Sequence, residues 1–285
     1  MVKSSWWVVV VAVASGACAS AGGSRDSGRV AAAPDRARLA ASPARIVSAE
    51  TETVGLGVVT YAVEVEVRND GATPAATEGL TLALTSGGRT LARRTFDASA
   101  SVAVGASARL VERWSVDTAQ LTSKDRELRP GVVVPCVLEA VVALRGPRGL
   151  QDAPASARVD LPLPTPPRLE ARTLRCAADG DRVRGTVRFD LQNPNVFPLD
   201  AERFSFSLRL GGAEVAVEAD TPPSLPPQGA APWDVAFEAA RSDARWAEGT
   251  APGVAFLLDG TLLAFSPFGV LVFPTGASGA IEISR

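Results

Sequence analysis

The residue types that most often carry catalysis are scarce in this chain of 285 residues. It has no histidine, and imidazole is the commonest general base and a favoured metal ligand. A Ser-His-Asp site, a Cys-His site and every zinc site that uses histidine are therefore excluded. The only lysines are Lys3 and Lys124, so imine chemistry has almost no candidate. We expect a protein that is not an enzyme and that holds no metal or other cofactor.

The carboxylates are scattered along the chain. Asp179 and Asp181 flank a glycine, but no acidic cluster completes the six to eight oxygen ligands, roughly, that calcium takes. We expect a hairpin turn there instead. Glu64 and Glu66 alternate with apolar residues, which is typical of the solvated face of a strand. The net charge is −2, so no overall field attracts nucleic acid, and we expect no nucleic-acid partner.

Asn193-Pro194-Asn195 is the polar stretch with the clearest pattern. It ends an alternating run and precedes Phe197 and Pro198. One interpretation is a β-sheet corner, in which proline ends the strand and the asparagine side chains bond nearby backbone groups. The other is a recognition surface for a partner or a sugar. We favour the corner, because turn chemistry accounts for each residue.

Apolar and polar residues alternate with a period of two in many runs, such as 63–67 and 187–191. This period is typical of strands that have one buried and one solvated face. Gly-Gly pairs at 87–88 and 211–212 join such runs and predict hairpin turns. The sequence therefore predicts an all-β fold. Two segments predict short helices instead: 117–128 and 238–249.

The chain also repeats itself. Three pairs of landmarks are each separated by 124 residues without gaps: Asn69 and Asn193, Gly87 and Gly211, and Gly105 and Gly229. A proline-rich stretch at 159–171 separates the two copies, and proline disfavours helix and stiffens a connection. We predict two tandem β-sandwiches of the immunoglobulin or fibronectin type III kind, at 44–163 and 164–285, with about seven strands each.

The N-terminal region predicts export. Lys3 precedes an apolar run that is too short to span a bilayer, and small residues follow it, as in a secretory signal peptide. Cys18 in "SGAC" resembles the lipidation site of bacterial lipoproteins, which places a lipoprotein-type signal at 1–18. Ordinary cleavage after Ala19 or Ala21 is the alternative. Residues 19–43 are small and polar and predict a flexible tether. We expect an exported protein of the bacterial envelope, anchored by lipid to the outer membrane.

The run from Val187 to Gly212 resembles the WHy domain (water stress and hypersensitive response), the body of the group-2 late-embryogenesis-abundant proteins. The matching features are the alternating strand, Asn193-Pro194-Asn195, Phe197-Pro198 and the glycine turn. Copy one has Asn69-Asp70-Gly71 in place of the full motif. The resemblance implies an immunoglobulin- or fibronectin-like sandwich and a role in desiccation tolerance through weak contacts with client proteins or membrane. The alternative is a structural adaptor that binds one envelope component.

Two further features leave alternatives open. Cys136 and Cys176 lie in different copies, and they either form a disulfide or are two buried thiols. The segment 262–274 is strongly apolar and contains Phe265, Phe268 and Phe273. It predicts buried core strands, with an exposed apolar contact surface for client protein or lipid as the alternative.

Overall fold

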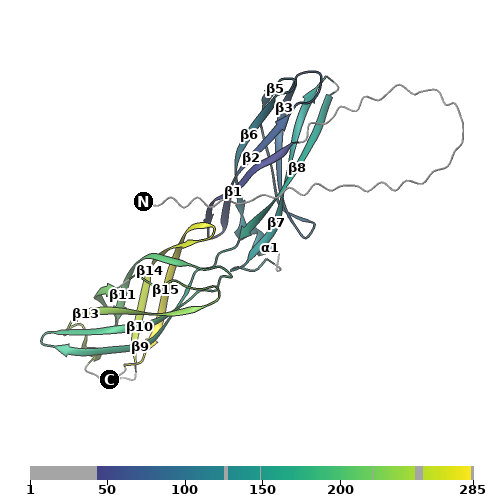
Figure 1. The fold of residues 1–285 in the computed structure, drawn as a ribbon. Helices are drawn as coiled ribbons and strands as arrows, with labels where there is room; N and C mark the ends of the chain where they lie inside the picture. The colour runs from purple at the N-terminus through teal and green to yellow at the C-terminus, as the bar shows by residue number, and fades with distance from the viewer. Residues whose placement is uncertain (1–43, 125–127, 148, 220, 248–252, 284–285) are drawn as a thin grey trace, which may run out of the picture. The chain divides into compact units, whose positions relative to one another are not determined.

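The computed structural model describes residues 44–124, 128–147, 149–219, 221–247 and 253–283 (Figure 1). Most of them lie in β-strands, and the sheets are antiparallel. The predicted all-β class is therefore confirmed. The described residues contain one α-helix, α1 (Thr118–Lys124), and one 3-10 helix, η1 (Arg245–Ala247), both inside segments where short helices are predicted. The predicted signal peptide, Cys18 and the tether lie outside the described residues.

The strands before residue 163 form two sheets. The first has the order β1-β2-β6, and the second has the order β4-β3-β7-β8, with β5 paired to β3. The alternation seen in the sequence is the reason: in β2 and β3 every second side chain is buried, and the residues between them face outward. The strand bounds are β1 Arg45–Gly55, β2 Val58–Arg68, β3 Ala75–Ser86, β4 Arg89–Phe96, β5 Ala100–Val102, β6 Ser107–Asp117, β7 Val133–Gly146 and β8 Gly149–Pro162.

The strands after residue 167 follow one path, in the order β15-β14-β11-β12-β13-β10-β9. Strand β12 joins the two layers of this sandwich, because Ala213 to Val215 pair with β11 and Ala216 to Ala219 pair with β13. The strand bounds are β9 Arg168–Asp179, β10 Arg182–Gln192, β11 Asp200–Leu210, β12 Ala213–Ala219, β13 Ala230–Ala240, β14 Val254–Ser266 and β15 Gly269–Ile281.

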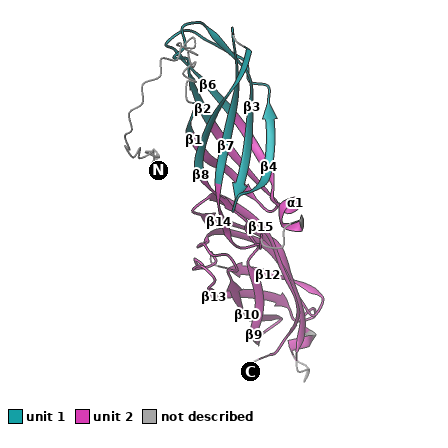
Figure 2. Cartoon of the chain, turned by 90° about the vertical axis from the view of Figure 1, so that its right-hand side faces the viewer, with its two compact units in different colours: residues 1–47, 64–111, 137–158 teal, residues 48–63, 112–136, 159–285 magenta. Residues whose placement is uncertain are grey.

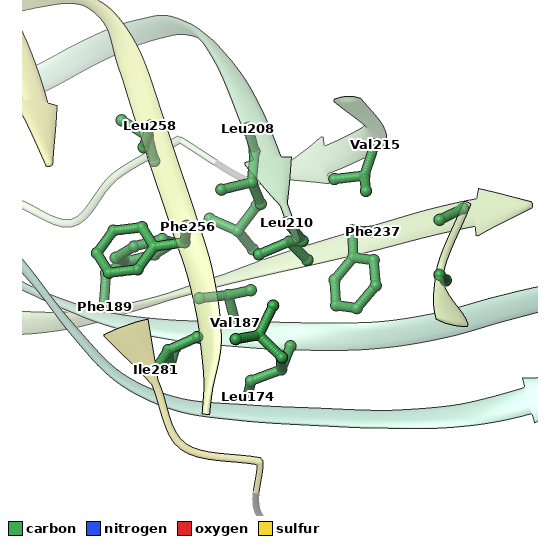
Figure 3. Packing of buried hydrophobic residues seen from close by; sticks show 14 of the residues in the cluster. Leu174, Val187, Phe189, Leu208, Leu210, Val215, Phe237, Phe256, Leu258 and Ile281 are labelled. Carbon is green, nitrogen blue, oxygen red and sulfur yellow. The ribbon is translucent and has the colours of Figure 1, made fainter. Parts of the chain in front are cut away.

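The two ends of this path meet. The backbone N–H of Leu174 in β9 donates to the carbonyl of Glu282, just after β15, at 3.1 Å. Between the layers lies one apolar core, in which side chains from both point toward one another (Figure 3). Phe189 contacts Trp233 and Phe256, with ring centroids 6.1 Å apart in each pair. Burial of large aromatic side chains is the main stabilising term for such a sandwich.

The strand order is the same in both copies, so the internal repeat is visible in the structure. The starts of β2 and β10 are 124 residues apart. After the short helices the spacing between equivalent residues of the two copies is smaller: Gly149 at the start of β8 and Gly269 at the start of β15 are 120 residues apart. The connection between η1 and β14 is therefore shorter than its counterpart in copy one.

The chain also divides into two compact units, coloured separately in Figure 2. Their bounds differ from the predicted domain boundary between residues 163 and 164, which stays a prediction. Each sheet nevertheless takes its strands from one side of residues 163–167. The first unit comprises 1–47, 64–111 and 137–158, and the second comprises 48–63, 112–136 and 159–285.

Each copy ends in an edge strand that contains a proline. Strands β8 and β15 are the last in their sheets. Pro154 and Pro274 each lie five residues after the glycine that begins the strand. Proline has no N–H to donate, so within sheets it is confined to edges and bulges. The two copies thus carry the same interruption at the same place.

Candidate functional site

Asn193 is buried at the corner that follows β10, where its side chain bonds two segments of backbone. Its Nδ2 donates to the carbonyls of Phe197 at 2.8 Å and Pro226 at 3.0 Å. Its Oδ1 accepts the backbone N–H of Asn195 at 3.0 Å. The side chain therefore occupies groups that would otherwise be buried without partners.

Asn69 in copy one makes the same set of bonds. Its Nδ2 donates to the carbonyls of Thr73 and Val102, each at 2.9 Å. Its Oδ1 accepts the N–H of Gly71 at 3.0 Å. The asparagine that marks the repeat in the sequence thus makes an equivalent set of hydrogen bonds within each copy. In both copies these bonds close the corner after the strand.

Asn195 makes hydrogen bonds that have no counterpart in copy one. It is fully buried, and its Nδ2 donates to the carbonyl of Thr165 at 2.9 Å while its Oδ1 accepts the N–H of Thr165 at 2.8 Å. Nδ2 also donates to Asn193 Oδ1 at 2.8 Å. The amide side chain thus pairs with Thr165 as a neighbouring β-strand would. In copy one the equivalent residue is Gly71, which has no side chain to do this.

Gly131 completes the arrangement, which lies wholly in the second unit. Its N–H donates to the carbonyl of Leu163 at 2.5 Å, and its own carbonyl accepts the N–H of Val196 at 2.8 Å. Gly131 has a φ of +88°, and a Cβ there would lie 2.8 Å from the carbonyl oxygen of Pro194. Only glycine fits this backbone conformation and this close approach.

These contacts use every polar atom of the Asn193 and Asn195 side chains. Such an arrangement holds the linker and the corner together, and it presents no side-chain donor or acceptor to a ligand. It is the arrangement that the corner interpretation predicts. The rest of the motif is apolar packing: Phe197 is buried, and its ring meets that of Phe268 edge-on with centroids 5.3 Å apart, while Pro198 is exposed.

The three phenylalanines of the apolar segment have different positions. Phe273 is fully buried, as the core-strand interpretation predicts, and is therefore not on a contact surface. Phe268 is half-buried against Phe197. Phe265 is 44% exposed. Because side chains alternate across a strand, the exposed positions of β14 and β15 share one side, away from the core.

An exposed apolar patch therefore lies on that side. Leu263 is paired with Val272 and Phe265 with Val270 across β14 and β15. Val270 and Val272 are 49% and 55% exposed. We call the apolar patch the five residues Leu263, Phe265, Val270, Val272 and Pro274. They form a hairpin end, drawn in yellow in Figure 1.

Copy one is charged at two of these five places. The counterparts of Phe265 and Val272, 120 residues earlier, are Arg145 and Asp152. Arg145 Nη2 donates to Glu78 Oε2 of the neighbouring strand at 2.9 Å. This contact lowers the pKa of the Glu78 carboxyl below its usual range. Leu150, the counterpart of Val270, is 55% exposed, so copy one has a smaller apolar patch, which the two charges interrupt.

Of the carboxylates singled out from the sequence, Asp179 and Asp181 are exposed, and Glu64 and Glu66 are half-buried. Asp179 and Asp181 flank Gly180 in the hairpin turn between β9 and β10, where Gly180 has a φ of +62°. Glu64 pairs with Arg109 at 2.9 Å on the outer side of β2. Within the described ranges no group of three or more histidine, cysteine or acidic side chains is placed to hold a metal ion.

The two remaining cysteines are thiols in the structure, on β7 and β9. Cys136 is buried, with its Sγ 3.4 Å from the carbonyl of Val134, and Cys176 is half-buried beside the core of copy two. The disulfide considered from the sequence is not formed. In the part of the chain that the structure describes, no helix has the length and apolar character needed to cross a bilayer.

Comparison with known proteins gives no family. No family model matches the chain, and no curated protein sequence is significantly similar to it. The resemblance to the WHy domain therefore stays a prediction.

Several solved structures are similar to the chain at low TM-scores. A bacterial adhesin from Mobiluncus mulieris with intramolecular disulfide, isopeptide and ester cross-links matches 85% of this chain and 99% of its own, at 9% identity and a TM-score of 0.33. Red sea bream transglutaminase matches 85% of this chain at 16% identity and a TM-score of 0.25, and the chain spans 31% of its length. At these TM-scores the likeness identifies neither a family nor an activity.

The sequence analysis missed the partners of the motif. Thr165 and Gly131 lie about 30 and 60 residues before Asn195, and neither stands out by type. The available signal was the difference between the copies. Asn195 aligns with Gly71 when the repeats are superposed in sequence, which indicates that the Asn195 side chain is not needed for the corner that both copies share.

Proposed function

We propose that the chain is a non-enzymatic protein of the bacterial cell envelope, anchored by lipid at Cys18. Its proposed role is to protect proteins or membrane during water loss through weak, reversible contacts. The non-enzymatic part of the proposal is supported by the absence of histidine from the sequence, and the stress role is supported by the resemblance of 187–212 to the WHy domain.

The observation that carries the contact mechanism is the apolar patch. Exposed valine and phenylalanine side chains gather at one hairpin end, although the apolar residues that alternate with them in the same strands are buried. Exposed apolar side chains that gather in this way are typical of interaction sites. The polar motif at Asn193 to Asn195 is not available for contact, because its side-chain atoms bond the chain itself.

The test is a drying experiment. The full chain is dried together with a desiccation-sensitive enzyme, and the recovered enzyme activity is compared with that after drying with an equal mass of an inert globular protein. We expect higher recovery with the chain. We expect the variant Phe265→Arg/Val272→Asp, which carries the residues of copy one at these positions, to protect less. Recovery equal to the inert control would remove the protective role.

A second candidate function is that of an adaptor for one envelope component. It is favoured by the larger apolar patch of copy two, since copy one has the Arg145–Glu78 pair at part of the same surface. A discrete patch on a rigid sheet suits one complementary surface better than many clients. Saturable binding to a single envelope protein, lost in the same double variant, would favour this candidate over general protection.

A further inference from the structure

The outward side of β11, β14 and β15 carries unpaired charges beside exposed apolar side chains. We call this side the outer face. It carries Arg203, Arg209 and Asp259, all exposed. None of the three makes a side-chain hydrogen bond or ion pair with another described residue.

The opposite sheet pairs most of its charges internally, although Arg168 and Arg175 of β9 are exposed without an ion pair among the described residues. Arg172 pairs with Asp190 at 2.6 Å, and Arg184 pairs with Glu238 at 2.8 Å and with Asp179 at 2.9 Å. Further pairs join Arg188 to Asp234 and Arg182 to Glu238. A surface of internally paired charges offers little to a partner, whereas unpaired charges beside exposed apolar groups are typical of an interface.

The unpaired charges and the apolar groups share one continuous surface. Arg203 lies opposite Leu263, at the edge of the apolar patch. Farther along the strands Arg209 lies opposite Leu257, which is 45% exposed, and Asp259 lies opposite Gly276. Because Gly276 has no side chain, the sheet is hollowed there.

This shallow hollow has a volume of about 450 Å³ and is lined by Leu257, Asp259, Gly276 and their neighbours on β14 and β15. The outer face thus offers an apolar end, a hollow with a carboxylate, and two guanidinium groups.

We infer that the outer face docks a second copy of this chain. A two-fold dimer interface uses the same surface on both subunits, so that surface must complement itself. The outer face meets this requirement: it carries unpaired charges of both signs, and exposed apolar side chains that can pack against their own kind. Arg203 or Arg209 of one copy then pairs with Asp259 of the other, and the apolar groups are covered.

The size of the outer face sets the expected strength. Three strands about 4.8 Å apart and about 12 residues long span roughly 14 Å by 40 Å. About 600 Å² on each copy is near the lower end for specific interfaces. The dimer is therefore reversible, and its fraction rises with protein concentration. This inference stands apart from the proposed function, although a dimer that covers the apolar patch would compete with a client for it.

The test is photo-cross-linking of the full chain in the cell. The photoreactive residue p-benzoylphenylalanine replaces Val272 in the apolar patch, and in the matched control it replaces Asp152, the equivalent position in copy one. We expect a covalent product of twice the chain mass, containing only this chain, from position 272 and not from 152. A product with a different protein or with lipid at 272, no product at 272, or an equal dimer product at 152 would overturn the inference.

A second measurement does not depend on the photoreactive residue. Two differently tagged full chains are produced together, and one is purified through its tag. We expect the other to co-purify, and the co-purified fraction to fall at least tenfold when both carry Phe265→Arg/Val272→Asp, with far-ultraviolet circular dichroism unchanged. An unchanged fraction in the folded variant would count against docking through the outer face.

Discussion

An asparagine amide can replace a stretch of backbone, because it has one carbonyl oxygen and two N–H donors. Asn193 uses its amide within the corner, as Asn69 does in copy one. Asn195 uses its amide across a longer loop, to pair with Thr165 in both directions. Two asparagines separated by one residue thus have separable roles, and substitutions can distinguish them.

Asn193→Ala should lower the free energy of unfolding by about 3 kcal/mol, because it leaves several buried backbone groups without partners at about 1–3 kcal/mol each. Asn195→Gly, which copies Gly71, should lower it by about 1–2 kcal/mol, because it removes the pairing with Thr165 and the bond to Asn193 Oδ1 but keeps the bonds of Asn193 to the backbone. Urea unfolding of both variants measures the difference. A larger effect from Asn195→Gly than from Asn193→Ala would contradict the assignment of roles.

Strand β10 has a glycine in its interior that the packing requires. A Cβ on Gly185 would lie 2.2 Å from the carbonyl oxygen of Arg175 and 2.7 Å from the ring of Phe237. Glycine inside a strand is otherwise unfavourable. Its presence therefore reflects the close approach of β9 and of the core ring rather than local preference.

Gly185→Ala should destabilise the protein by about 2 kcal/mol, since neighbouring backbone and a core ring must shift. Gly146 at the end of β7 is the matched control, because a Cβ there meets no atom within 4 Å. Gly146→Ala should change the free energy of unfolding by less than about 0.5 kcal/mol. Thermal unfolding followed by circular dichroism measures both, and equal destabilisation would show that the close approach at Gly185 does not matter.

The strands could be predicted from the sequence because their signal is local. Period-two alternation and Gly-Gly pairs gave the hairpins at 87–88 and 211–212, and both glycine pairs have positive φ in the structure. The exposure of each side chain in the segment 262–274 could not be predicted from local sequence. Phe265 and Phe273 are the same residue type with similar neighbours, yet the first is exposed and the second is buried. Which of the two alternating sets of residues faces the core depends on how the strand pairs with its neighbours.

At the scale of the whole chain, the composition fixes the response to pH. With no histidine, no side chain has an ordinary pKa between about 5 and 8. The stability should therefore be flat across that interval. Contacts with Arg45 and Arg145 lower the pKa of Glu66 and Glu78. Such groups stabilise the fold above the ordinary carboxyl pKa, and this contribution is lost as the pH falls through the lowered value.

At alkaline pH the stability falls as the pH rises, which is opposite to its dependence at acidic pH. Tyr61 is buried, and its hydroxyl donates to the carbonyl of Asp160 at 2.9 Å. Burial raises its pKa far above the ordinary value, so its contribution is present below pH about 10 and is lost above it. Because the chain has one tyrosine, phenolate absorbance should appear together with unfolding. Phenolate formation at pH about 10 in a folded chain would contradict this.

The prolines of the edge strands have a consequence for what happens when water is removed. Drying brings proteins to concentrations at which open sheet edges recruit one another into cross-β fibrils. Pro154 and Pro274 interrupt the last strand of each copy, so neither edge offers an unbroken row of donors to an incoming strand. These two edges are therefore poor templates for strand addition at the concentrations that drying produces.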